Sequence, residues 1–129
     1  MANATTTQSF IDGPRNLVIK VTGILDTSDI SPAIVVVDPN TGQFPAAKCR
    51  LDRVNYAISD GLQVRLYWDA TVPTLINVLS GRGRIDAYEF GGELNNAASP
   101  TGNITLATEG FATGVISAFT LLLEMVKQP

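Results

Sequence analysis

Alternation of apolar and polar residues with a period of two is the feature that most constrains the fold of this chain. In residues 62–69, the apolar side chains of Leu62, Val64, Leu66 and Trp68 fall on one face and the intervening residues fall on the other. Successive side chains of a β-strand point to opposite faces of its sheet, so this spacing predicts a half-buried antiparallel strand. Trp68 belongs to the apolar row and is expected in the core.

A second alternating run lies just upstream. Val54, Tyr56 and Ile58 alternate with more polar or smaller residues, and Asp60-Gly61 separates this run from the strand at 62–69. An Asp-Gly pair tolerates the positive φ angles of a two-residue type I′ turn. We therefore predict that the two runs form a β-hairpin.

Further strands are expected along the rest of the chain. They lie at residues 17–22, 33–37, 104–106 and 115–127, and residues 73–79 fit a strand better than a short helix. The run at 115–127 is apolar on both faces, which is typical of a strand that is central in its sheet or is covered by another subunit. No long stretch has the 3.6-residue periodicity of an amphipathic helix.

Together these patterns predict an all-β protein. The 129 residues (13.7 kDa) suit a single domain, and a hydrophobic content of 45% is enough to fill a core. We expect an antiparallel β-sandwich of seven or eight strands, with a jelly roll as one form of it, spanning residues 10–129. Residues 1–9 form a polar, Thr-rich N-terminal arm, which either adds to the sandwich as an edge strand or lies on a neighbouring chain.

The composition excludes several classes of function. The chain has no histidine and a single cysteine, Cys49, which removes Ser–His–Asp and Cys–His catalytic groups, imidazole metal sites and thiolate zinc clusters. No nucleophile, base and oxyanion donor gather in the sequence, so we expect neither enzymatic activity nor a cofactor. A net charge of −3 argues against binding nucleic acid by bulk charge. No apolar segment approaches the length of a membrane span, and the first residues do not resemble a signal peptide.

Acidic residues offer one alternative to a purely structural protein. Asp26, Asp29 and Asp38 fall in expected loops, where oxygen ligands for calcium are often found. Their spacing matches no known calcium loop, and Asp is common in turns because its side chain accepts hydrogen bonds from nearby backbone. Turn formation is the favoured interpretation, and no metal site is predicted.

The most concentrated basic feature is residues 80–84, with the sequence Ser-Gly-Arg-Gly-Arg. One interpretation is a phosphate site, but the spacing lacks the Walker pattern. A second is a tight turn in which Arg82 and Arg84 pair with Asp86 or Glu89. A third makes the two arginines contacts to an acidic patch on another subunit, and the last two are favoured equally over the first.

Three segments carry a resemblance to a known group of proteins. Residues 11–26, 66–70 and 81–86 resemble small virion structural proteins of tailed bacteriophages, a group that includes capsid cement or decoration proteins. The resemblance implies a β-rich, non-enzymatic subunit that binds and reinforces the shell of major capsid proteins. The alternatives are a tail, neck or fibre component of the virion, and a non-enzymatic module that binds glycans or calcium.

The expected function directs attention to contact residues. We predict that Thr5, Thr6 and Thr7 of the arm, together with Arg82 and Arg84, contact other subunits. The expected partners are the major capsid protein or other virion subunits, and further copies of this chain in a homo-oligomer. The protein would be made in the host cytoplasm and would end in the virion.

Overall fold

The computed structural model describes residues 3–30, 33–42, 44–97, 100–112 and 114–128. Within these residues the chain forms nine β-strands and one short 3-10 helix, η1 (Tyr88–Phe90). The strands are β1 (Ala4–Asp12), β2 (Asn16–Leu25), β3 (Ile34–Val37), β4 (Lys48–Ile58), β5 (Gln63–Ala70), β6 (Thr74–Leu79), β7 (Arg82–Asp86), β8 (Pro100–Glu109) and β9 (Ser117–Gln128).

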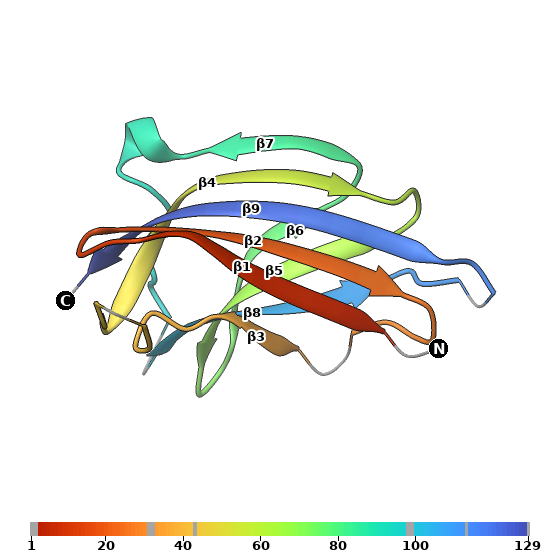
Figure 1. The fold of residues 1–129 in the computed structure, drawn as a ribbon, viewed down its shortest axis with the longest axis horizontal. Helices are drawn as coiled ribbons and strands as arrows, with labels where there is room; N and C mark the ends of the chain where they lie inside the picture. Colours follow the sequence, from red (N-terminus) through yellow and green to blue (C-terminus); the bar gives the residue numbers. More distant parts are fainter. Residues whose placement is uncertain (1–2, 31–32, 43, 98–99, 113, 129) are drawn as a thin grey trace.

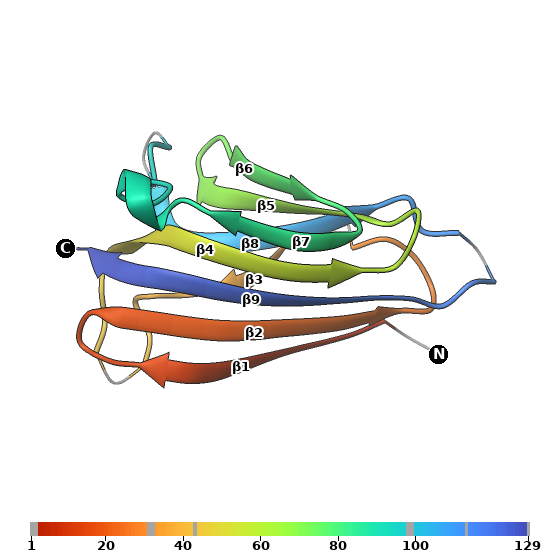
Figure 2. The same cartoon turned by 90° about the horizontal axis from the view of Figure 1, so that it is seen from above.

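The strands form two antiparallel sheets that pack face to face (Figures 1 and 2). One sheet has the order β1-β2-β9-β4-β7 and the other has the order β3-β8-β5-β6. Strands β2 to β9 follow the order of an eight-stranded jelly roll, and β1 adds a fifth strand to the first sheet. The predicted all-β sandwich is confirmed, with nine strands among the described residues in place of seven or eight.

The core lies between the sheets and is built from the alternating apolar rows. Leu66 and Trp68 of β5 and Leu121 and Leu123 of β9 are at most 2% exposed. Their neighbours in sequence point outward, which is the arrangement that the period of two predicts.

The two-sided apolar character of the last strand has its explanation in the sheet order. β9 lies between β2 and β4 at the centre of the five-stranded sheet. Its outward side chains Leu122 and Val126 remain partly exposed. Of the two explanations left open by the sequence, the central position is confirmed.

The predicted hairpin of residues 54–59 and 62–69 is wrong. The turn is present, because the Leu62 amide donates to the Ser59 carbonyl over 3.2 Å and Gly61 has a φ of +81°. However, β4 and β5 belong to different sheets, so the turn carries the chain across the sandwich. Both apolar rows reach the core in either arrangement, so alternation alone does not distinguish strands that lie side by side from strands that face each other.

The arm is an integral part of the five-stranded sheet. Residues 4–9 form the first part of β1, which continues to Asp12 and pairs with β2 along its length. Hydrogen bonds hold both ends of this strand. The Asn3 side chain accepts from the Asp26 amide (2.9 Å), and the buried Lys127 ammonium donates to Asp12 Oδ1 (2.5 Å). The sequence left open whether this segment is an edge strand of the sandwich or lies on a neighbouring chain, and the structure shows the edge strand.

Candidate contact surface

Strand pairing decides which of the candidate residues share a face. Opposed residues of an antiparallel pair point to the same side of the sheet. Arg82 of β7 opposes Ala57 of β4, which opposes Thr120 of β9, and the same row continues through Thr22 to Thr6. Thr6 and Arg82, 76 positions apart in the sequence, therefore lie at opposite ends of one row on the side of the five-stranded sheet that faces away from the core.

A second row runs parallel to the first. Arg84 opposes Asn55, and the row continues through Leu122 and Lys20 to Gln8. We call these two rows the outer face. The outer face consists of Thr6, Gln8, Lys20, Thr22, Asn55, Ala57, Arg82, Arg84, Thr120 and Leu122, with three cations and no carboxylate.

The next row has a different electrostatic character. Arg53 pairs with Asp86 on β7 (3.2 Å) and with Glu124 on β9 (3.5 Å). These two carboxylates, Asp86 more than Glu124, raise the pKa of Arg53 above its ordinary value. Because Asp86 pairs with Arg53, the predicted pairing of the loop arginines with Asp86 is wrong.

Arg82 and Arg84 are exposed, and neither forms an ion pair with any residue that the structure describes. Their segment is a regular edge strand, β7, that follows a turn at Gly81 with a φ of +69°. The tight-turn interpretation of residues 80–84 is therefore wrong for residues 82–84, which lie in the strand that follows the turn. The two guanidinium groups are left available to a carboxylate or a carbonyl of another molecule.

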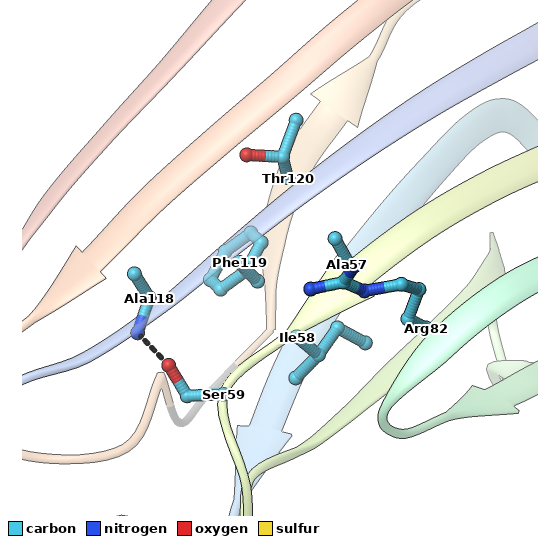
Figure 3. A pocket seen from close by; sticks show the side chains of 7 residues that line it. All are labelled: Ala57, Ile58, Ser59, Arg82, Ala118, Phe119 and Thr120. Atoms are coloured by element: carbon cyan, nitrogen blue, oxygen red, sulfur yellow. Dashed lines mark hydrogen bonds between the residues drawn. The ribbon is translucent and has the colours of Figure 1, made fainter.

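A shallow depression lies at one end of the outer face (Figure 3). Small side chains, Ala57, Ala118 and Thr120, surround it, and Arg82 extends across β4 toward it. The Ser59 hydroxyl accepts a hydrogen bond from the Ala118 amide (2.9 Å), which holds the β4–β5 turn against β9. An open hollow with one arginine at its rim suits a protruding side chain or loop of a protein partner better than a small molecule, which needs a more enclosed pocket.

The other two candidate threonines lie on the opposite side of β1. Thr5 opposes Gly23 and Thr7 opposes Val21, so both side chains point toward the inner side of the sheet. Thr7 is nevertheless exposed, and it lines a recess beside Leu17 and the loop at residues 38–42. The structure thus brings Thr6, Arg82 and Arg84 onto one face and leaves Thr5 and Thr7 outside it.

Two of the acidic loop residues, Asp29 and Asp38, accept hydrogen bonds from other groups of the chain. Asp29 Oδ1 accepts from the Thr108 hydroxyl (3.1 Å) and from the Phe111 amide (3.0 Å), and Asp38 Oδ1 accepts from the Asn40 amide (3.1 Å). The contact of Asp38 is that of a turn-forming carboxylate, whereas Asp29 binds residues far along the chain and fastens its loop to them. Across the described ranges, no group of three or more metal-binding side chains comes together.

Cys49 is fully buried in the core. Burial raises the pKa of its thiol to about 12, although the positive charge of Lys127 acts in the opposite direction. The thiol is therefore protonated near neutral pH, which is the opposite of what an activated nucleophile requires.

Several residues of the outer face were not identified from the sequence. Lys20, Thr22, Asn55 and Thr120 occupy polar positions in otherwise apolar strands, and that alternation was the one available signal. Their assembly into rows depends on the strand order, which no local pattern encodes.

Comparison of the chain with protein-family models, curated proteins and solved structures finds no match. Among the helices in the described part of the chain, none has the length and apolar character needed to cross a membrane.

Proposed function

We propose that this protein is a structural subunit of a tailed-phage virion, a capsid cement or decoration protein that binds the shell through the outer face. The resemblance of residues 11–26, 66–70 and 81–86 to such proteins supports this assignment. A jelly roll is also among the folds used by capsid proteins, although a fold by itself does not specify a function.

The observation that carries the proposal is the distribution of charge on the outer face. The whole chain is acidic, with a net charge of −3, yet Lys20, Arg82 and Arg84 lie together on two rows that contain no carboxylate. Such a surface is complementary to an acidic patch on another protein and disfavours contact with a basic one. Its breadth, five strands from β1 to β7, suits a flat protein surface.

Weak individual contacts are sufficient for this role. A shell presents the same binding site many times, and a subunit that engages two sites at once gains affinity without any new type of contact. Each exposed arginine adds little by itself because water and salt screen its charge.

Sedimentation of the purified protein with capsids that lack it tests the proposal. We expect the wild-type protein to pellet with the capsids, and its affinity to fall as the salt concentration rises. The double variant Arg82→Glu/Arg84→Glu should lose at least tenfold in affinity. Arg15→Glu, which reverses an exposed arginine in the loop between β1 and β2, serves as the control and should bind like the wild type.

Two results would contradict the proposal. One is an absence of binding by the folded wild-type protein at low salt. The other is an equal loss of affinity in the control and the double variant, which would show a response to total charge and not to the outer face. Quantitative mass spectrometry of purified virions then gives the copy number of the protein. This number distinguishes a location on the capsid from a location in the tail, since a shell needs hundreds of copies and a tail needs far fewer.

A further inference from the structure

The sandwich has four sheet edges within the described residues, and three of them are protected against pairing with another strand. β7 carries Arg82, Arg84 and Asp86. β3 has four residues and a register shift against β8, and β6 has a register shift in its middle. Short length, charge and bulges are the usual means by which proteins block edge-to-edge association.

β1 is the least protected of the four edges. It is nine residues long, carries no charge before Asp12, and pairs regularly with β2 from Ala4 to Ser9. One register shift follows, between Ser9 and Ile11. Because the hydrogen bonds of Asn3 and Lys127 hold its two ends, β1 presents its free backbone N–H and C=O groups as a fixed edge.

The sequence of β1 is complementary to itself. We propose that β1 pairs with β1 of a second copy of this chain, antiparallel and centred on Thr7, so that two five-stranded sheets join into one sheet of ten strands. A two-fold axis normal to the sheet requires opposed residues to share a face, so their numbers must sum to an even value. Centring on Thr7 overlaps five residues of the regular part of the strand, and centring on Thr6 overlaps as many, but only the Thr7 register brings Phe10 of one copy beside Ala4 of the other.

This register opposes uncharged residues throughout. Thr7 faces Thr7 of the second copy, Thr6 faces its Gln8, and Thr5 faces its Ser9. Cross-strand pairs of Thr with Thr or Ser are favourable, whereas charges of one sign directly opposite each other are not. The same symmetric pairing centred on Arg84 of β7 would place two arginines against each other.

The register also covers exposed apolar side chains at both ends of the joined strands. Phe10 is 52% exposed and its ring lies 5.5 Å from the Lys20 ammonium, which places the ring on the outer side of the sheet. At the other end of β1, Ala4 opposes Ile24, which is also 52% exposed on that side. In the pair, Phe10 of one copy lies beside Ala4 of the other and reaches its Ile24, and this contact occurs twice.

The interface is small compared with the roughly 800 Å² per partner of a standard complex, so we expect a dimer that dissociates in the micromolar range. The dimer would present two copies of the outer face on one continuous sheet. The inference does not rest on the proposed function, since the pairing is measured on the isolated protein.

Cysteine cross-linking tests the register directly. In Thr7→Cys the two new thiols face each other with their Cα atoms about 5 Å apart, within the range of a disulfide. In Thr6→Cys the Cα atoms are about 8 Å apart, because residue 6 opposes residue 8. Under mild oxidation we expect Thr7→Cys to form dimers at least tenfold faster than Thr6→Cys. The native Cys49 is buried and does not compete.

Charge variants supply the second measurement, by analytical ultracentrifugation over a wide concentration range. Thr6→Lys/Gln8→Lys should lower the affinity of the dimer at least tenfold, because lysines then oppose each other. Thr6→Lys/Gln8→Glu should restore it, because each lysine opposes a glutamate of the other copy. Leu75→Lys/Val78→Lys places two lysines on exposed positions of β6 and should leave the dimer unchanged.

Each alternative outcome overturns the inference. A wild-type protein that stays monomeric to millimolar concentration, or equal cross-linking rates at positions 6 and 7, would exclude the proposed pairing. A dimer that tolerates the β1 lysines but dissociates with the β6 lysines would place the contact on β6. Circular dichroism and thermal melting of each variant establish that the fold is intact.

Discussion

The contact between Gly23 and Phe119 gives the sharpest test of the packing inside the five-stranded sheet. Gly23 of β2 directly opposes Phe119 of β9, and the ring, which is 2% exposed, covers the glycine. A Cβ built on Gly23 would overlap the Cζ and Cε1 atoms of the ring and would lie 3.0 Å from Cε2. Gly23→Ala should therefore destabilise the protein by about 1–3 kcal/mol, the usual cost of overpacking a core.

A double-mutant cycle isolates the role of the ring. Phe119→Leu removes the overlapping atoms and should cost about 1 kcal/mol by itself. In that background Gly23→Ala should be neutral or stabilising by up to about 1 kcal/mol, since alanine restricts the unfolded chain more than glycine does. The coupling energy between the two positions is then about 1–4 kcal/mol.

Urea unfolding followed by the fluorescence of Trp68, the single tryptophan, measures all four proteins. Gly13→Ala is the control, because a Cβ there meets only the Asn16 carbonyl at 3.7 Å. If Gly23→Ala has no effect in the wild-type background, the ring turns aside freely. If Gly23→Ala lowers the stability equally in both backgrounds, the strain does not come from Phe119. Either of these two results would contradict the reasoning.

Three further predictions concern two buried side chains, Trp68 and Cys49, and the partly buried Glu93. Trp68→Ala should destabilise the protein by about 3–5 kcal/mol, measured by urea unfolding followed by circular dichroism, because the indole is 2% exposed; a cost below about 1 kcal/mol would contradict its place in the core. Cys49, whose pKa is raised to about 12 by burial, should resist iodoacetamide at pH 8 in the folded protein and react once urea unfolds it, and rapid labelling of the native state would be the opposite result. Burial raises the pKa of Glu93, although the hydrogen bond from Asn77 acts in the opposite direction. The folded state therefore binds the carboxyl proton of Glu93 more tightly than the unfolded state does. The resulting stabilisation is present at low pH and is lost as the pH rises through the folded-state pKa. Glu93→Gln should therefore flatten the decrease in melting temperature between mildly acidic and neutral pH, and an unchanged profile would count against the shift.

Local periodicity was enough to predict most of the strands that carry a buried apolar row, whereas β7 was not predicted and β1 was left undecided. The rows that contain Leu66 and Trp68, and the two-sided apolar run of β9, follow from side-chain alternation, which the sequence displays directly. Within residues 73–79, Thr74–Leu79 form a strand, β6, as favoured over a helix.

The same alternation could not predict which strands pair with each other. The turn at Asp60-Gly61 exists, but the two strands that it connects lie in different sheets, because an apolar row reaches the core from either sheet. β1 was left undecided since its Thr-rich sequence has no apolar alternation, and its strand depends on backbone pairing with β2.

Strand pairing also decided which of the candidate contact residues share a face. Thr6, Arg82 and Arg84 were selected by composition, and the pairing of five strands places them on one face. Thr5 and Thr7 point to the other side because neighbouring residues of a strand alternate, a consequence that became visible once β1 was known to be a strand.

An electron cryomicroscopy reconstruction of virions from the phage that encodes the chain, under the role proposed above, tests the central claim most directly. The account predicts density for the jelly roll at many equivalent positions on the shell, with the side chains of Arg82 and Arg84 against the capsid protein. Particles without the chain, or a chain whose outer face points into solvent while another surface contacts the shell, would contradict it.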